Sequence, residues 1–565
     1  MPSAITVDKN TSLGEALRRV CAAYPEREAI IFRNDRTTYR QLGDKVQALA
    51  AGLHRLGINE GDKVGLVLPD CPEFIYAFFA LCRLGAVAVP LSPQLRSREV
   101  HHILSDSEAV AVISLDKVPG SDLAEMIAGL RPELPNLRHQ VVKGDERPTG
   151  AYSLDELFDY QAALELPQDT VGHDDVAALI YTSGTTGLPK GSIHTHHTLI
   201  APVVATLKLR EAWMPRASVQ SVVRIAKAVG RYRMRLLKAA GKQQTFLGVH
   251  SYHGMGGMQV ILQALLTGDK LVIMDKFHPV EMLKLIEQEK VSIIITVPTI
   301  LAIVMKVQDL DKYDLSSVLV CGTGSAPVPP KLAYEIKERI GCALAIGFGT
   351  TEVAGMVSAT SLLDPDSAQA ETVGKLLPGV EAKIVDEQRQ EVPTGEVGEV
   401  AVRVDAVMKG YYKAPEATAA VLDADGWYYT GDLATMDDQG YMRIVGRKSD
   451  MIKRSGQCIF PKEIEDSLAT HPQIADVAVL GVPGVLGSEQ VWAYVVPQDG
   501  AELTAKAVVE YCRGRIAPYK TPEEVRIVSE LPKAAATGKT QKHKLRDLAI
   551  EEHRRKREVR SEEVR

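Results

Sequence analysis

The 565-residue sequence lacks the cysteine pattern of a disulfide-rich or zinc-binding protein. Its seven cysteines form no C-x-x-C pair, and their number is odd. Disulfide frameworks and structural zinc sites are usually built from paired, closely spaced cysteines, so neither is expected here. We therefore expect free thiols and a reducing compartment, the cytoplasm.

The sequence also lacks a secretory signal and a long, uninterrupted apolar run. Its first residues contain no basic stretch followed by an apolar one. The most apolar segment, residues 74–91, is interrupted by Arg83 and punctuated by Gly85 and Pro90. This pattern predicts a buried helix followed by a buried strand rather than a membrane span. The net charge of -6 gives no reason to expect a nucleic-acid partner.

No internal repeat is present, and helix patterns alternate with strand patterns in the first half of the chain. Residues 42–56 have apolar side chains at helical spacing, and residues 63–68 read as a short buried strand. This alternation predicts parallel α/β sheets. Further strands are predicted at residues 87–91, 270–274, 291–297 and 317–321.

From about residue 392 the pattern changes to short strands separated by glycine and aspartate turns, which predicts a small β-rich subdomain. Beyond it lies a compact α+β pattern of about 100 residues, a reasonable size for a domain. We predict an α/β protein with a large N-terminal domain of α/β sheets plus the small β subdomain, and a small α+β C-terminal domain. The expected boundaries are 1–446 for the first domain, 447–455 for a hinge, 456–545 for the second domain and 546–565 for a charged tail.

Glycines and hydroxyl residues alternate in the segment 181–191 (YTSGTTGLPKG), and a lysine follows them. Glycines allow backbone N–H groups to surround an anion, and hydroxyl groups add donors. The P-loop pattern does not fit, because Lys190 lies between Pro189 and Gly191. The length and regularity of the string favour a phosphate-binding loop over a polar surface loop. The residues assigned to the phosphates are Thr182, Ser183, Gly184, Thr185, Thr186, Gly187 and Lys190.

This loop resembles the phosphate-binding signature of the adenylate-forming superfamily, which includes acyl-CoA synthetases, adenylation domains and firefly luciferase. The resemblance extends through most of the chain, with further motifs in the family's order. They are residues 324–327 (GSAP), 347–352 (GFGTTE), 429–432 (YTGD), 446–447 (GR) and 531–539 (LPKAAATGK). Phe348 replaces the family's usual tyrosine and keeps a ring that stacks on adenine.

The resemblance implies attack of a substrate carboxylate on the α-phosphate of ATP, with pyrophosphate leaving. Thr351 would donate to the α-phosphate, and Glu352 would hold Mg²⁺, which prefers carboxylate and phosphate oxygens. Lys539 would contact both the carboxylate and the α-phosphate. The nucleotide contacts would be completed by Gly324, Ser325, Ala326, Gly347, Phe348, Gly349, Thr350, Asp432 at the ribose hydroxyls, and Arg447. Taken singly, Glu352 could instead cap a helix and Lys539 could be an ordinary solvated lysine.

Two further segments bear on the acceptor of the acyl group. Residues 250–257 (HSYHGMGG) resemble the family's H-x-x-G motif, with His253 as its histidine, His250 as the competing candidate and a structural histidine as the alternative. Residues 454–465 resemble the thioester-forming loop, in which Ser455, Gly456 and Gln457 would line the CoA tunnel. The resemblance implies a mobile C-terminal domain that rotates after adenylation. The hinge position falls on Ser449, where the family carries Asp or Lys.

The acyl pocket is assigned to Tyr252, His253, Thr299, Gly322, Gly324 and Met356. Small residues leave room there, and no basic residue would pair with a second carboxylate. We therefore expect an aromatic, alicyclic or medium-chain monocarboxylic acid as substrate, with ATP, Mg²⁺ and coenzyme A. The alternatives are an adenylation enzyme that loads a carrier-protein thiol, and a nucleotide-binding sensor built on an inactive synthetase.

The segment that begins at Lys208 and ends at Lys242 is strongly basic, with ten lysines and arginines against one acid, Glu211. Three interpretations stay open: a solvated insertion, an amphipathic helix on an anionic membrane surface, and contact with the CoA phosphates. The oligomeric state is also left open, with a homodimer as one alternative.

Overall fold

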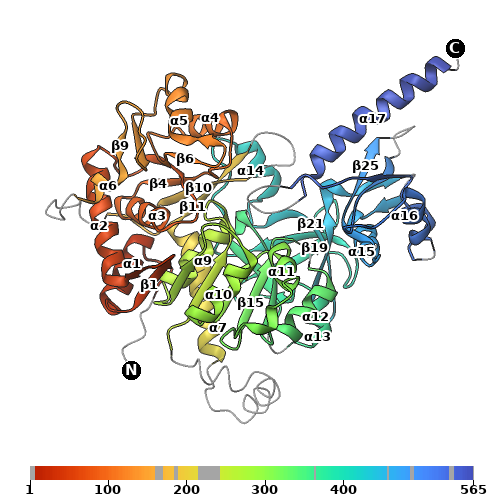
Figure 1. The fold of residues 1–565 in the computed structure, drawn as a ribbon, viewed down its shortest axis with the longest axis horizontal. Helices are drawn as coiled ribbons and strands as arrows, with labels where there is room; N and C mark the ends of the chain where they lie inside the picture. The colour runs from red at the N-terminus through yellow and green to blue at the C-terminus, as the bar shows by residue number, and fades with distance from the viewer. Residues whose placement is uncertain are drawn as a thin grey trace, which may run out of the picture. The chain divides into compact units, whose positions relative to one another are not determined.

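The computed structural model describes residues 7–159, 170–182, 189–213, 242–326, 328–361, 364–454, 457–483, 489–513, 515–533 and 540–563. The chain divides into two compact units, one of residues 1–381 and 402–428 and the other of residues 382–401 and 429–565 (Figure 1). The first unit contains both large sheets. The predicted α/β class is confirmed.

A nine-stranded sheet carries most of the predicted site. Its six central strands run parallel, and its edge strands pair antiparallel. In spatial order the strands are β18 (Lys375–Leu376), β17 (Gly355–Ala359), β16 (Ala343–Thr350), β15 (Val320–Gly324), β14 (Ile293–Thr296), β12 (Thr245–Val249), β13 (Lys270–Ile273), β1 (Glu28–Phe32) and β2 (Asp35–Thr38).

A seven-stranded sheet forms the other half of the first unit. It is parallel except for the antiparallel pair that flanks the predicted phosphate loop. Its strands in order are β11 (Lys190–Thr195), β10 (Val176–Thr182), β4 (Val87–Pro90), β3 (Lys63–Val67), β5 (Ala111–Leu115), β8 (His139–Lys143) and β9 (Tyr152–Ser153). A separate short hairpin joins β6 (Lys117–Val118) to β7 (Ser121–Asp122).

Helices cover both faces of each sheet in the first unit. Apolar side chains of α3 and α9 pack together with both sheets in one core cluster. A second cluster joins α10, α11 and α12 to the nine-stranded sheet, and a third joins α4 and α5 to the seven-stranded sheet. The helices are α1 (Leu13–Ala23), α2 (Tyr39–Arg55), α3 (Pro72–Leu84), α4 (Ser97–Asp106), α5 (Leu123–Leu130), α6 (Leu154–Phe158), α7 (His196–Trp213), α9 (Met255–Leu265), α10 (Pro279–Glu289), α11 (Pro298–Met305), α12 (Pro330–Arg339), α13 (Asp366–Glu371) and α14 (Pro415–Val421).

The predicted helix and strand of residues 74–91 are confirmed as α3 and β4. Helix α3 begins with Pro72 and ends at Leu84, and it is capped by Gly85, whose φ of 70° lies in the left-handed region that glycine tolerates. Two predicted strands begin later than expected: the strand predicted at residues 291–297 begins at Ile293, and the strand predicted at residues 317–321 begins at Val320. A turn, in which the Val318 N–H bonds to the Leu315 carbonyl, delays entry into the sheet.

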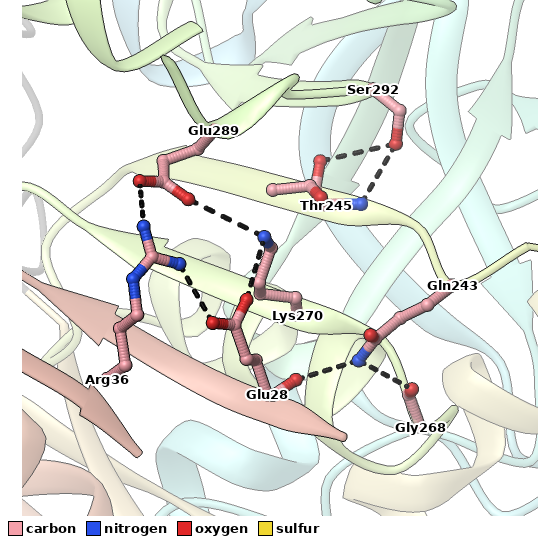
Figure 2. Close-up of polar contacts among 8 residues, drawn as sticks. All are labelled: Glu28, Arg36, Gln243, Thr245, Gly268, Lys270, Glu289 and Ser292. Carbon is pink, nitrogen blue, oxygen red and sulfur yellow. Dashed lines mark hydrogen bonds and ion pairs between the residues drawn. The ribbon is translucent and has the colours of Figure 1, made fainter. Parts of the chain in front are cut away.

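A ring of four charges ties the edge hairpin β1–β2 to the body of the nine-stranded sheet (Figure 2). Arg36 donates to Glu28 at 2.9 Å and to Glu289, at the end of α10, at 2.7 Å. Lys270 of β13 lies 3.2 Å from Glu28 and 3.5 Å from Glu289. Burial alone would raise the pKa of Glu28, but Arg36 and Lys270 hold that pKa below its usual value. The two cations thus balance two carboxylates that would otherwise repel each other.

The second unit contains the predicted small β subdomain and the C-terminal α+β segment. A four-stranded sheet is formed by β19 (Glu381–Val385), β20 (Gly398–Arg403), β21 (Tyr428–Met436) and β22 (Met442–Arg447). The other elements are β23 (Ile452–Arg454), β24 (Gln457–Ile459), α15 (Pro461–Ala469), β25 (Ile474–Pro483), β26 (Glu489–Pro497), α16 (Ala505–Cys512), β27 (Glu524–Ile527) and α17 (Lys542–Glu563). Helix α17 includes residues 546–563 of the predicted charged tail. Its Leu545 and Ala549 are buried with Trp492 of β26.

The six cysteines whose side chains are described form no disulfide and are buried. None of the helices in the described part of the chain combines the length and apolarity that a membrane span requires. The basic segment that we singled out lies almost entirely at residues outside the described ranges, so its three interpretations stay open.

Candidate active site

Several of the predicted nucleotide and acyl residues lie at one edge of the nine-stranded sheet. Gly324 ends β15, and Thr350 ends β16 beside it. Tyr252 and His253 follow the carboxyl end of β12, and Thr299 follows that of β14. These four strands are neighbours in the order β16, β15, β14, β12. The carboxyl edge of a parallel sheet is the usual ligand site of α/β proteins, so this arrangement fits a binding site.

Glycines are required where β15 and β16 end. Gly324 pairs with Gly347, and a Cβ atom at Gly324 would lie 2.6 Å from the Gly347 carbonyl oxygen. A Cβ atom at Gly349 would lie 2.0 Å from the carbonyl oxygen of Gly355 in β17. Side chains at these two positions would therefore push the strands apart. Ser325 follows in the left-handed region with a φ of 64°, so the chain turns sharply at the predicted adenine side.

The carboxylate of Glu352 lies in a short 3-10 turn, Thr351–Val353, directly after β16. Its Oε1 atom accepts a hydrogen bond from the Tyr411 hydroxyl at 3.0 Å. Its backbone carbonyl accepts from the N–H of Met408 at 2.7 Å. Tyr428 is buried beside it, and burial, together with the Glu352 charge, raises the pKa of Tyr428. Glu352 is therefore fixed by a tyrosine and a neighbouring backbone, and it caps no helix of the described chain.

The two strands that flank the predicted phosphate loop are well defined. Thr182 of β10 pairs with Lys190 of β11. The Tyr181 hydroxyl donates to Asp106 at 2.5 Å, and a Cβ atom at Gly191 would lie 3.0 Å from the Tyr181 ring. The ammonium of Lys190 lies 5.8 Å from the centroid of the Tyr411 ring. Tyr411 thus contacts both the lysine of the loop and the predicted magnesium ligand.

The predicted acyl residue Tyr252 is held by a residue that the motifs did not indicate. The Tyr252 N–H donates to the carboxylate of Asp70 at 2.8 Å, and the Tyr252 ring lies 5.7 Å from that of Phe74. Tyr252 Oη and His253 Nε2 are buried and have no hydrogen-bond partner among the described residues. Burial lowers the pKa of His253 to about 4, so its imidazole is neutral at pH 7. The same holds for the competing candidate, His250.

Asp70→Asn is expected to raise the free energy of unfolding at pH 8 by about 1–3 kcal/mol. Burial raises the pKa of Asp70 to about 7, above its unfolded value, so stability is lost as the pH rises through 7. Asparagine keeps an oxygen that accepts from Tyr252 but has no charge to form. Urea unfolding at pH 8 and pH 5 would measure the effect, and the gain should shrink at pH 5. A variant that is less stable than the parent at pH 8 would contradict this assignment.

The remaining acyl candidates differ in exposure. Met356 of β17 is 54% exposed, and its sulfur occupies the space that a Cβ atom of Gly347 would need. Gly322 lies inside β15, where a Cβ atom would meet the end of the Ile295 side chain at 2.6 Å. Thr299 is exposed at the start of α11. Thr299 and Met356 lie near the carboxyl ends of β14 and β16, at the same sheet edge as Tyr252 and His253.

Asp432 and Arg447 lie in the second unit and contact each other. They pair across β21 and β22, and the Arg447 Nε atom lies 2.9 Å from Asp432 Oδ1. Asp432 is buried, and its N–H donates to the Thr430 hydroxyl at 3.1 Å. The predicted hinge residue Ser449 lies in a 3-10 turn, Lys448–Asp450, directly after β22.

Several predicted site residues lie outside the described ranges. They are Ser183, Gly184, Thr185, Thr186 and Gly187 of the loop, Ser455 and Gly456 of the CoA tunnel, and Lys539. Gln457 is placed by its backbone at the start of β24. The roles of these residues stay predictions.

Tyr411 and Asp70 were missed by sequence reasoning. Tyr411 is 59 positions from Glu352, and Asp70 is 182 positions from Tyr252. The only local signal for Tyr411 is a glycine followed by two tyrosines at residues 410–412, which on its own indicates a turn.

The donor set fits the implied Mg²⁺. No group of three or more His, Cys, Asp or Glu side chains in the described ranges could hold a metal by itself. Mg²⁺ usually takes one or two protein carboxylates and completes its shell with phosphate and water oxygens. Glu352 supplies such a carboxylate: it meets the hydroxyls of Tyr411 and Tyr428, and a carboxylate has about four acceptor positions, so positions remain for a metal.

Comparison with known proteins agrees with this geometry. The model of the AMP-binding enzyme family matches residues 17–412, and that of the AMP-binding enzyme C-terminal domain matches residues 463–539. The chain is 32% identical to the medium-chain fatty-acid–CoA ligase of Escherichia coli (strain K12), over 95% of this chain and 90% of that protein. It is also 32% identical to triostin synthetase I of Streptomyces triostinicus, over 95% and 94% of the two chains.

Among solved structures, the anthranilate CoA ligase AuaEII in complex with anthranoyl-AMP superposes with a TM-score of 0.81. It is 27% identical and covers 97% of this chain and 99% of that one. The first family match includes Thr182, Glu352 and Tyr411, and the second covers part of the C-terminal segment. The chain belongs to the AMP-binding enzyme family.

Proposed function

We propose that the protein is an ATP-dependent carboxylic acid–CoA ligase. A carboxylate oxygen attacks the α-phosphorus of ATP and pyrophosphate leaves, which gives an acyl-adenylate. The CoA thiolate then attacks the acyl carbonyl, and AMP leaves. The observation that carries the proposal is the grouping of Lys190, Tyr411 and Glu352, which places a cation and a fixed carboxylate beside the strands of the phosphate loop.

The predicted site residues have separate tasks in the first step of this reaction. Lys190 and the loop bind the phosphates, and Thr351 donates to the α-phosphate, where charge develops. Glu352 holds the Mg²⁺, which neutralises charge on the phosphate oxygens when it is bound. Asp432 accepts from the ribose hydroxyls, and Lys539 contacts the carboxylate and α-phosphate together.

For the substrate we propose a monocarboxylic acid with an aromatic or alicyclic ring or a medium-length chain. The acyl candidates at the sheet edge are apolar or small, apart from a neutral imidazole and a hydroxyl group. No lysine or arginine belongs to this set, so a second carboxylate would remain unpaired. The similarity to an anthranilate CoA ligase and to a medium-chain fatty-acid–CoA ligase supports the same range of acids.

The test is a panel of acids incubated with ATP and Mg²⁺, with pyrophosphate measured first and AMP measured after CoA is added. We expect pyrophosphate release with ring or medium-chain monocarboxylic acids, and AMP release that requires CoA. Activity with dicarboxylic acids alone would contradict the substrate class. Pyrophosphate release without CoA-dependent AMP would contradict the acceptor.

The second candidate function is an adenylation enzyme that loads a carrier-protein thiol. The similarity to triostin synthetase I favours it. The two candidates separate in one assay: AMP formation that requires CoA supports the ligase, whereas AMP formation that requires an added phosphopantetheinyl carrier protein supports the alternative.

A further inference from the structure

The segment that carries Tyr411 extends the seven-stranded sheet beyond its last strand. The N–H of Lys409 bonds to the Ile193 carbonyl at 3.0 Å, and the N–H of Ile193 bonds to the Gly410 carbonyl at 2.9 Å. The N–H of Tyr412 bonds to the Gly191 carbonyl at 2.7 Å. Residues 409–412 therefore run along β11, the strand that follows the predicted phosphate loop.

The same segment is tied to the turn that holds Glu352. The N–H of Met408 bonds to the Glu352 carbonyl at 2.7 Å, and the Tyr411 hydroxyl bonds to its carboxylate at 3.0 Å. Residues 408–412 thus hydrogen-bond to two different sheets of the first unit, through β11 on one side and the turn after β16 on the other. They link β11 to the turn that carries the Glu352 carboxylate.

Neighbouring contacts hold Tyr411 in place. Its N–H donates to the Thr418 hydroxyl at 2.9 Å. Gly410 has a φ of 138°, and a Cβ atom there would lie 2.8 Å from the Thr418 methyl group. On the other side, Lys413 donates to the Asp106 carbonyl at 2.9 Å, and the Tyr412 hydroxyl donates to Glu108 at 3.0 Å. The Tyr411 backbone is therefore fixed independently of its hydroxyl group.

We propose that Tyr411 is a positioning residue for the magnesium–ATP complex: its hydroxyl orients the Glu352 carboxylate, and its ring holds Lys190 on the same side. This proposal rests on the proposed role of Glu352 as the magnesium ligand. A hydrogen bond to a charged acceptor stabilises one orientation of the carboxylate before the metal arrives. The ring face attracts the Lys190 ammonium, so one side chain orders both the anionic and the cationic partner of the phosphates.

Tyr411→Phe is expected to raise the Mg²⁺ concentration needed for half-maximal ATP binding by about tenfold, because the bond to a charged acceptor is lost. ATP binding without Mg²⁺ should stay unchanged, because phenylalanine keeps the ring beneath Lys190. Tyr411→Leu should weaken binding in both conditions. Calorimetric titration of ATP into the full chain, at a series of Mg²⁺ concentrations, measures all three.

Tyr412→Phe is the matched control, since it removes a hydroxyl from the adjacent tyrosine, whose partner is the surface residue Glu108. It should leave the Mg²⁺ dependence unchanged. The proposal is overturned if Tyr411→Phe and Tyr412→Phe behave alike, or if Tyr411→Phe weakens ATP binding equally with and without Mg²⁺. The titration contains neither acid nor CoA, so a failed acid panel would leave its result intact.

Discussion

Lys539→Ala is expected to lower acid-dependent pyrophosphate release by about 10²–10³-fold, while ATP still binds. Charge accumulates on the α-phosphate oxygens as the carboxylate attacks, and two anions must approach each other. A single ammonium group that contacts both anions lowers the barrier to this attack. It stabilises the transition state more than it stabilises the bound ATP complex. Pyrophosphate release and calorimetric ATP titration would be measured on the same preparation.

Lys542→Ala is the matched control for this prediction. Lys542 is three positions away and forms an ion pair with Glu465 at 2.6 Å, within the second unit. Its removal should leave the rate of pyrophosphate release unchanged.

A second measurement separates the two half-reactions. CoA-dependent AMP release from a supplied acyl-adenylate should survive in Lys539→Ala, because that step forms no bond to phosphorus. Pyrophosphate release at the parent rate would remove Lys539 from the mechanism. Loss of ATP binding would show that Lys539 stabilises the bound ATP complex instead of the transition state.

The parts of the site that the sequence predicts are those whose chemistry is local. Glycines at Gly324 and Gly349 are needed because carbonyl oxygens lie within 2.6 Å and 2.0 Å of any Cβ atom there, and such close approaches lie within short motifs. The helix and strand of residues 74–91 follow from one apolar run. In both cases the pattern and its physical cause occupy the same few residues.

The parts that the sequence does not predict depend on contacts between distant segments. The pairing of β1 with β13 joins residues about 240 positions apart, and no local pattern indicates it. The bond between Tyr411 and Glu352 is a hydroxyl-to-carboxylate contact whose partners are brought together only when residues 408–412 cross between two sheets. Tyrosine is common in cores, so its position in the sequence alone gives it no role.

Acidification from pH 7.5 to pH 5 is expected to remove about 4 kcal/mol of stability through two buried histidines, His194 and His196. Both are fully buried, and burial lowers the pKa of His194 to about 3 and that of His196 to about 4. The unfolded chain, with a histidine pKa near 6.5, takes up these protons first, so stability falls as the pH drops below 6.5. Each histidine contributes about 2 kcal/mol at pH 5.

The contacts of His196 show what protonation would break. Its Nδ1 atom accepts a hydrogen bond from the N–H of Leu13, the first residue of α1, at 3.2 Å. A proton on Nδ1 would face that N–H group, and the Asp175 carboxylate, which favours the charged imidazole, has a smaller effect on the pKa than burial. His196→Asn keeps an acceptor near the same place and cannot be protonated.

Asp70 acts in the opposite direction, because its raised pKa makes the folded state bind a proton between pH 7 and pH 4. It offsets part of the histidine effect in the parent protein. Urea unfolding followed by circular dichroism should therefore give an order of stability lost between pH 7.5 and pH 5: largest for Asp70→Asn, intermediate for the parent and smallest for His196→Asn. The stability lost by His196→Asn should be about 2 kcal/mol smaller than the stability lost by the parent. Equal losses of stability in His196→Asn and the parent would contradict this prediction. They would mean that the His196 imidazole is protonated in the folded protein at pH 5, so that its Nδ1 atom could not accept the hydrogen bond from Leu13.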